Sequence, residues 1–469
     1  MTVQDREYVA KMVKSAAEAQ LVQDMIDKAY AAQKILEEYN QEQVDALVHD
    51  IAKVVFDNAE MLAREAVDET RMGVYEDKVK KNQGKARVIW SDLKGKKSVG
   101  IINEMPELGL IEVAKPMGVV GAVTPTTNPI VTPMCNAMFA IKGRNAVIVS
   151  PHPRSKKCSS HTVALMREAL EKRGAPADLI QVIEKPTVEL SGLVMKLCDV
   201  CISTGGGPMV RAAYASGKPA FGVGSGNVQC LIDENVDIEK VVPMIIEGRR
   251  FDNGIICSGE QTAIMPAKDY DRIVAEFKKD GAFYIDDPAQ VDALRATIFP
   301  KGVMNKDCVG QSAVKVAQMA GIEVPADTKV ILVKAAGYGT ADDYGKEKMC
   351  PVIAAYAYEN WAEGVEIARQ NLEVVGKGHS VCIHSSNDEN IRYAAKVLPV
   401  SRFLLNQICS TNNGGSFFNS LSATTTLGCG SWGNNSISEN LSWKHLFNVS
   451  RIAAVRPGSK MPTDEEIWG

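Results

Sequence analysis

Residues 119–150 read VVGAVTPTTNPIVTPMCNAMFAIKGRNAVIVS, and this stretch decides the fold. Its two ends, 119–124 and 146–150, are short runs rich in β-branched residues, which is typical of strands buried on both faces. The residues between them, 133–142, favour a helix. A strand, a helix and a second strand with short connections predict neighbouring parallel strands, because parallel strands need a crossover of this kind.

The same alternation continues along the chain. Extended segments are predicted at 110–114, 179–182, 200–203, 261–265, 330–333, 381–384 and 403–406, and helices at 159–172, 270–280, 360–370 and 389–397. This pattern indicates an α/β fold with two doubly wound domains of parallel strands. Such sheets bind ligands at the carboxyl ends of their strands.

The first hundred residues are predicted to be a helical scaffold. Apolar residues recur at steps of three and four from Val44 to Val55, so they share one helix face. Asn40 and Gln43 precede that face at the spacing of a capping box, in which each side chain bonds the other residue's backbone N–H. In contrast, residues 412–435 are rich in Gly, Ser, Thr and Asn, and a loop of that length is typically functional.

The composition excludes several classes of protein. The 469 residues include 53 basic and 57 acidic side chains, and the net charge of −4 offers no large positive field for nucleic acid. No run of about 18 apolar residues could span a membrane, and the start, MTVQDREYVAKMV, lacks a signal peptide's apolar segment. Eleven scattered cysteines are not a disulfide framework. We expect a cytoplasmic protein, although residence in a bacterial microcompartment stays open.

Four segments at predicted strand ends carry candidate chemistry. Glycines at 205–207 separate a strand from a helix, as in phosphate sites, although a tight turn explains them equally. FGVGSGN at 221–227 is either a ligand contact or a crossover between domains. Cys257, within DNGIICSGEQT at 252–262, is either a nucleophile for carbonyl carbon or a buried structural thiol. Asn128 is either an oxyanion donor or a turn residue.

No metal site is predicted. Cys198 and Cys201 have C-x-x-C spacing, but no second pair of ligands accompanies them, as zinc requires. His379 and His384 lie five positions apart on one predicted strand, so they project from opposite faces.

Together, the motifs resemble the aldehyde dehydrogenase superfamily, and its CoA-acylating branch in particular. Seven occur in the family's order: KPMGVV at 115–120, TTNP at 126–129, SPHP at 150–153, the glycine cluster at 204–207, GVGSGN at 222–227, IICS at 255–258 and KEKMCP at 346–351. The tail TTTLGCGSWGNNSISEN at 424–440 is similar to that of acylating acetaldehyde and succinate-semialdehyde dehydrogenases. The resemblance covers nearly the whole chain and implies an aldehyde dehydrogenase-like fold.

The resemblance also implies roles for individual residues. Cys257 matches the catalytic nucleophile, and Asn128 matches the side-chain half of the oxyanion hole, whose other half is the Cys257 backbone N–H. Glu347 matches the glutamate that binds the nicotinamide ribose. The other positions expected to bind cofactor are Thr124, Pro125, His152, Arg154, Thr204, Gly205, Gly206 and Gly224. NAD and NADP both stay open, because the basic residues 154–157 either pair with a 2′-phosphate or begin a solvated helix.

Two departures distinguish the chain from hydrolytic aldehyde dehydrogenases. Those enzymes carry a glutamate base where this chain reads GVGSGN, but residues 220–229 hold no acid; they also carry a lysine where this chain has His152. Hydrolysis of a thioester needs an activated water, whereas a CoA thiolate attacks without that base. The resemblance therefore implies NAD(P) as cofactor and CoA as co-substrate. The alternatives are a hydrolytic enzyme and a non-catalytic binding protein, and the presence of Cys257 with Asn128 disfavours the latter.

The substrate is expected to be a short aldehyde with a terminal anion. The segment QICSTNNGGSFFNS, 407–420, is expected over the aldehyde pocket; it lacks a run typical of acetaldehyde enzymes and is more similar to the succinate-semialdehyde type. Succinate semialdehyde is therefore expected, with sulfoacetaldehyde and acetaldehyde as alternatives. Arg402 is a second-choice cation, expected to be a helix-end charge outside the pocket. The candidates to hydrogen-bond the anion are Ser258, Ser410, Thr411 and Asn412.

The resemblance finally implies domain boundaries and partners. The dinucleotide-binding domain is expected to comprise residues 1–104 and 116–230, the catalytic domain residues 231–436, and an oligomerisation arm residues 105–115 and 437–469. Extended segments at 110–114 and 449–455 are similar to strands that family members exchange, which favours a homodimer or homotetramer. No iron-binding second half is seen before Gly469, so alcohol formation is expected to require a separate alcohol dehydrogenase.

Overall fold

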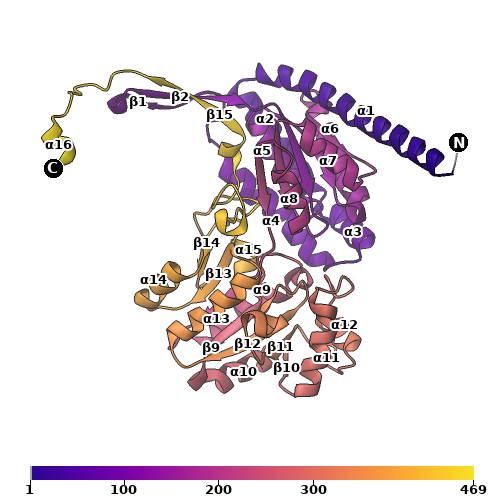
Figure 1. Cartoon of the computed structure of the whole chain (residues 1–469), viewed down its shortest axis with the longest axis vertical. Helices are drawn as coiled ribbons and strands as arrows, with labels where there is room; N and C mark the ends of the chain where they lie inside the picture. Colours follow the sequence, from indigo (N-terminus) through magenta and orange to yellow (C-terminus); the bar gives the residue numbers. More distant parts are fainter. Residues whose placement is uncertain (1–2) are drawn as a thin grey trace.

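The strands of the protein form three separate sheets (Figure 1). The computed structural model describes residues 3–469, with side chains from residue 15; residues 1–2 of the predicted first domain lie outside the described residues. Two of the sheets are entirely parallel and belong to the two lobes of the molecule, and the third is a small antiparallel sheet that extends away from them.

A five-stranded parallel sheet forms the centre of the upper lobe in Figure 1. Its order is β5-β4-β3-β6-β7, with bounds Ile180–Val182, Ala146–Pro151, Val119–Thr124, Val200–Thr204 and Ala220–Val223. The predicted strand at 119–124 is thus correct at both ends, and all of its residues are buried, as expected for a sheet covered on both faces. The accompanying helices are α5 (Val131–Lys142), α6 (Lys156–Lys172), α7 (Val188–Leu197) and α8 (Gly207–Tyr214).

Four helices precede this sheet and pack into the same apolar core. They are α1 (Val3–Glu37), α2 (Gln41–Asp57), α3 (Ala59–Thr70) and α4 (Tyr75–Leu93). The predicted capping box of α2 is confirmed: the Gln43 backbone N donates to Asn40 Oδ1 at 2.9 Å, and the Asn40 backbone N donates to Gln43 Oε1 at 2.9 Å. Within residues 3–469, no helix has both the length and the apolar content needed to cross a bilayer.

A seven-stranded parallel sheet forms the lower lobe. Its order is β10-β11-β12-β9-β8-β13-β14, with bounds Ala282–Ile285, Val330–Lys334, Val352–Tyr358, Thr262–Pro266, Gln229–Ile232, Gly378–His384 and Val400–Leu405. Along β9, Ile264 belongs to one apolar cluster and its neighbours Ala263 and Met265 to another, so the sheet has a core on each face. The helices are α9 (Ile238–Arg250), α10 (Tyr270–Lys279), α11 (Pro288–Ile298), α12 (Ala313–Met319), α13 (Trp361–Val374) and α14 (Asp388–Val397).

The sequence patterns missed some strands of this lobe and misplaced another. β10 and β12 were not predicted, although turn residues such as Gly281 and Pro351 precede them; their burial comes from the neighbouring strands of the sheet. β14 begins at Val400, three positions before the predicted start at Phe403. The other predicted strands and helices are present with ends shifted by a few residues.

The chain passes from the first sheet to the second between β7 and β8, within residues 224–228. The third sheet has the order β1-β2-β15, with bounds Gly100–Met105, Leu110–Pro116 and Phe447–Ala453. It projects from the upper lobe and is followed by the short helix α16, Asp464–Trp468, at the end of the chain (Figure 1). The extended segments expected in the arm are therefore paired strands; the domain boundaries and the oligomeric state stay predictions.

Candidate active site

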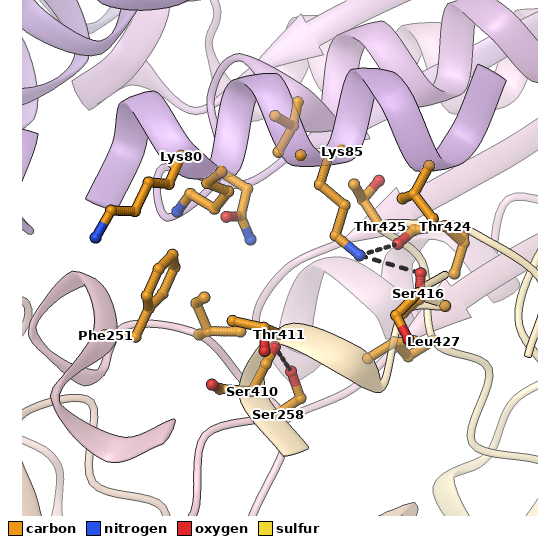
Figure 2. A pocket seen from close by; sticks show the side chains of 18 of the residues that line it. Lys80, Lys85, Phe251, Ser258, Ser410, Thr411, Ser416, Thr424, Thr425 and Leu427 are labelled. Carbon is orange, nitrogen blue, oxygen red and sulfur yellow. Dashed lines mark hydrogen bonds between the residues drawn. The ribbon is translucent and has the colours of Figure 1, made fainter. Parts of the chain in front are cut away.

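A cavity of about 260 Å³ lies against α4 and is lined by residues from several distant parts of the sequence (Figure 2). It contains all the predicted catalytic and substrate residues except Asn412, which ends α15 (Cys409–Asn412) and whose carbonyl accepts a hydrogen bond from Asn419 Nδ2 at 3.0 Å. The predicted residues in the lining are Asn128, Cys257, Ser258, Ser410 and Thr411. The two lobes thus bring their candidate residues to a single site.

Cys257 differs from every other cysteine of the chain. It is partly exposed in the cavity, whereas the other ten are buried. Beside it, Ser258 is buried, and its hydroxyl donates to the Ser410 carbonyl at 3.0 Å, which joins the nucleophile segment to α15. Of the two interpretations of Cys257, this placement favours an accessible nucleophile over a packed structural thiol.

A tight turn, Phe251–Gly254, leads from α9 toward Cys257. Asp252 and Asn253 have φ values of 52° and 53°, which is the left-handed region. Each non-glycine residue there costs about 1–2 kcal/mol, so the surrounding contacts must hold the turn in place. The turn redirects the chain and allows Cys257 to face the cavity.

The surroundings of Cys257 disfavour the ionised form of its thiol. Burial raises its pKa to about 12, and the negative charge of Glu347 raises it as well, while the Arg402 guanidinium opposes both effects. Burial also raises the pKa of Glu347, to about 7, although Arg249 and hydrogen bonds from Gly226 and Ser225 act in the other direction. A carboxylate that titrates near neutrality can accept a proton at working pH.

The crossing segment between the sheets packs directly against Cys257. A Cβ atom at Gly226 would lie 1.8 Å from the carbonyl oxygen of Cys257, so only glycine fits there. The segment GVGSGN is thus the crossover between the two sheets, and its contact with a ligand stays a prediction. Glu347 approaches from this side, through its bond with Gly226, and is not among the residues that line the cavity.

Most of the predicted cofactor residues lie along one edge of the five-stranded sheet. Thr124 ends β3 and pairs with Pro151, which precedes His152, and Thr204 ends β6 and pairs with Val223, which precedes Gly224. The buried hydroxyls of Thr124 and Ser203 have no hydrogen-bond partner. A Cβ at Gly205 or Gly224 would meet no atom within 4 Å, so the backbone there faces open space. A dinucleotide fits this carboxyl edge, which offers open glycines and unused hydroxyls.

The basic residues at the start of α6 do not choose between NAD and NADP. The Arg154 guanidinium donates to the Thr70 carbonyl at 3.3 Å. The first backbone N–H groups of α6, at Lys157 and Cys158, donate to the Glu69 carboxylate at 2.9 and 2.8 Å. A carboxylate from α3 thus already stabilises this helix N-terminus, and Arg154 has a partner within the protein, so the choice between NAD and NADP stays open.

Helix α4 supplies a wall of the cavity, which the sequence analysis assigned to scaffold only. Three lysines of α4 contribute to this wall, Lys80, Lys81 and Lys85, and Figure 2 labels Lys80 and Lys85. Helical spacing places Lys81, Lys85 and Val88 on one face, and that run of lysines beside an apolar residue is the signal that could have identified them.

Lys85 is the cavity lysine without a carboxylate partner among residues 15–469, since Lys81 pairs with Asp252 and Lys80 lies 3.9 Å from Asp77. Its ammonium donates to the carbonyls of Gly414 and Thr424 at 3.0 and 3.4 Å, as the dashed lines in Figure 2 show. Burial lowers its pKa to about 8. Lys85 therefore keeps a positive charge at neutral pH that no carboxylate of residues 15–469 pairs with.

Arg402 is not the helix-end charge that the sequence suggested. It lies within β14, is 3% exposed, and donates to the carbonyls of Gly428 and His379 at 2.7 and 2.9 Å. It does not line the cavity. Buried carbonyl oxygens hold this guanidinium in place, so it affects the site through its field rather than by contact.

One group of potential metal ligands is present in the described part of the chain, outside the cavity. Cys230 and Cys382 face each other on neighbouring strands β8 and β13, and His384 lies two positions along from Cys382. Strand pairing creates this buried group, which the spacing of the residues in sequence did not reveal. It offers three ligands, and a structural zinc site has four; the expectation of no metal stays a prediction.

Comparison with known proteins supports the resemblance. Residues 4–293 match the aldehyde dehydrogenase family. The chain is 55% identical to a succinate-semialdehyde dehydrogenase (acetylating) of Clostridium kluyveri over 96% of this chain and 99% of that protein, and 41% identical to a sulfoacetaldehyde dehydrogenase of Acholeplasma over 96% and 94%. The crystal structure of a propionaldehyde dehydrogenase of Rhodopseudomonas palustris, with bound CoA and an acylated cysteine, matches with a TM-score of 0.84 and 28% identity, over 92% of this chain and 97% of that one.

Proposed function

We propose, since the chain belongs to the aldehyde dehydrogenase family, that it interconverts an aldehyde and an acyl-CoA through a thioester on Cys257. The observation that carries this proposal is the meeting of a partly exposed Cys257 with Asn128 in one cavity. Among the described residues, that cavity is lined by no aspartate or glutamate. A site without a carboxylate beside the bound acyl group does not activate water, so it favours transfer to a thiol over hydrolysis.

The first step is addition of the Cys257 sulfur to the aldehyde carbon. The thiol must first lose its proton to solvent; the charge of Glu347, which raises the pKa of Cys257, opposes that loss, and the Arg402 guanidinium favours it. The oxyanion that forms is stabilised by the Asn128 side-chain amide and the Cys257 backbone N–H. One such donor contributes about 10²–10³ in kcat in comparable sites.

The later steps remove a hydride from the bound substrate and then transfer the acyl group to CoA. The nicotinamide, when bound, supplies the acceptor for the hydride that leaves the aldehyde carbon. Thr124, His152, Thr204, Gly206 and the open glycines at 205 and 224 would hold the dinucleotide, with Glu347 toward its nicotinamide ribose. A CoA thiolate then attacks the thioester on Cys257, the bond from carbon to Cys257 sulfur breaks, and acyl-CoA leaves. Thiol exchange conserves the thioester, so the sequence is reversible.

A terminal anion on the substrate is supported by Lys85. The cavity walls around it are largely apolar, with Val88, Val131 and Leu427, and Lys85 offers an ammonium with no carboxylate partner in the described chain. Ser410, whose buried hydroxyl has no hydrogen-bond partner, adds a second donor. We therefore propose succinate semialdehyde, and the corresponding succinyl-CoA in the reverse direction, as substrates. Sulfoacetaldehyde is the second candidate, because a sulfonate would satisfy the same cation.

The three sheets have separate roles in this proposal. In this proposal the five-stranded sheet holds the dinucleotide, the seven-stranded sheet carries Cys257, and the antiparallel arm contacts another subunit. Exposed apolar residues on the arm, Ile101, Leu108 and Ile452, favour that contact.

The test is a panel of aldehydes and acyl-CoA esters assayed with both nicotinamides, with products identified by mass spectrometry. We expect nicotinamide reduction that requires CoA and yields succinyl-CoA, and no turnover by Cys257→Ala. Release of a free acid at full rate without CoA, or activity that survives Cys257→Ala, would contradict the proposal.

A further inference from the structure

The strained turn that precedes Cys257 is held by a buried carboxylate. Asp252 is fully buried, and its Oδ1 accepts from the Val74 backbone N at 2.9 Å. Its Oδ2 accepts from Lys78 Nζ at 3.0 Å and from Lys81 Nζ. These donors all lie at or near the start of α4, so the nucleophile loop of one lobe is fastened to a helix of the other.

The turn at Asp252 and the residues before α4 are packed closely against each other. Position 73 requires glycine for two reasons. A Cβ there would lie 1.9 Å from Asp252 Oδ1, and the backbone φ of +82° is in the left-handed region. Asn253, the second left-handed residue, donates to the Gly310 carbonyl at 3.0 Å. Close packing and hydrogen bonds therefore hold the turn against α4 together with the two ion pairs of Asp252.

Lys81 differs from Lys78 in one contact. Both ammonium groups bond Asp252 Oδ2, and both side chains are buried, 8% and 3% exposed. Lys81 alone also donates to the Thr127 carbonyl, at 3.4 Å, and Thr127 directly precedes Asn128. Lys81 also lines the active-site cavity together with Asn128 and Cys257.

We propose that Lys81 is a positioning residue for the oxyanion hole, because its ammonium ties the loop of Cys257 to the loop of Asn128. The two halves of the hole, the Cys257 N–H and the Asn128 amide, come from different lobes, and no strand is shared between those lobes. A single buried cation that bonds both loops fixes their separation. This inference rests on the proposed function, since it assigns Lys81 to the same reaction.

The matched comparison is Lys81→Met against Lys78→Met. Each variant removes one ammonium from Asp252 and leaves the other, so their melting temperatures should fall by similar amounts. For Lys81→Met we expect kcat to fall about 10–100-fold, the size of effect that a small misplacement of a reacting group produces. KM for the aldehyde should change little. Lys78→Met should keep kcat within about threefold, and Lys81→Arg, which keeps the cation, should recover most of the activity.

Two measurements separate positioning from other roles. Because Lys81 is proposed to act through Asn128, the double variant Lys81→Met/Asn128→Ala should be no slower than Asn128→Ala alone. The loss should also be equal for succinate semialdehyde and for butyraldehyde, which has no anion. Effects that multiply in the double variant, or a loss confined to the anionic substrate, would overturn the proposal.

The failure of this inference is distinct from failure of the proposed function. A wild-type protein without CoA-dependent activity would refute the function. An active wild type in which Lys81→Met and Lys78→Met behave alike would refute only the role of Lys81. If a methionine variant does not fold, as circular dichroism will show, the same comparison with Lys81→Gln and Lys78→Gln decides the question.

Discussion

Replacing Lys85 by methionine tests the proposed substrate class directly. The ammonium has a pKa of about 8, lowered by burial, so about 90% of it is charged at pH 7. A hydrogen bond to a charged group contributes about 1.5–3 kcal/mol, which corresponds to about 10–150-fold in kcat/KM. We therefore expect Lys85→Met to lose about that factor with succinate semialdehyde.

The ratio of two substrates isolates the charge effect. Lys85 also bonds the carbonyls of Gly414 and Thr424, so its loss disturbs that loop for every substrate. Butyraldehyde has a methyl group where succinate semialdehyde has its carboxylate, and it reports that disturbance alone. The assay is kcat/KM for both aldehydes, followed by nicotinamide absorbance in the presence of CoA. Lys80→Met is the comparison variant, and its smaller expected effect follows from its 66% exposed side chain.

The pH dependence has a defined sign. Because the pKa of Lys85 is lowered to about 8, the ammonium is present below that pH and lost above it. The preference of the wild type for the anionic aldehyde should therefore decrease as pH rises through about 8, while the preference of Lys85→Met should stay flat. An equal loss with both aldehydes, or a flat wild-type profile, would refute the role of Lys85 in anion binding.

Three further predictions concern the nucleophile and its surroundings. Glu347→Gln removes a negative charge that raises the pKa of Cys257 and that is present above about pH 7. Iodoacetamide should therefore alkylate Cys257 faster in this variant at pH 8–9, by about tenfold for each unit that the Cys257 pKa falls. Equal alkylation rates in variant and wild type would refute an effect of the Glu347 charge on Cys257. Asn128→Ala should lower kcat by about 10²–10³ with the melting temperature nearly unchanged, and a loss below threefold would exclude it from the oxyanion hole. Gly226→Ala places a Cβ 1.8 Å from the Cys257 carbonyl oxygen and should abolish turnover while the protein still binds NAD(P)H by fluorescence titration; near-normal turnover would contradict the close packing.

The sequence predicted much of the fold because the signals involved are local. Strand β3 and the capping box of α2 depend on residues within a few positions of one another, and both are found as predicted. β10 and β12 were missed because their burial comes from neighbouring strands, which a sequence window does not contain. The burial of Arg402 within β14 likewise depends on distant segments that a sequence window does not contain.

Some residues of the candidate site could also be predicted from local sequence, and others could not. Cys257 and Asn128 could be named from the sequence because motifs surround them, and the family they resemble has a fixed order of motifs. Asn412 was named on the same basis, but it is not among the residues that line the cavity. Lys85 and Lys81 were assigned to scaffold, since their helix precedes the recognisable motifs.

Taken alone, the sequence determined the α/β class and the family and predicted Cys257 as the nucleophile, because those depend on local periodicity and on the order of the motifs. Only the tertiary structure decided which of the eleven cysteines is accessible, which lysine keeps an unpaired charge, and how the loops of Cys257 and Asn128 are joined. The physical reason is that exposure, desolvation and ion pairing arise between segments far apart in the chain. Asp252 and Lys81, 171 positions apart in the sequence and bonded in the fold, are an example.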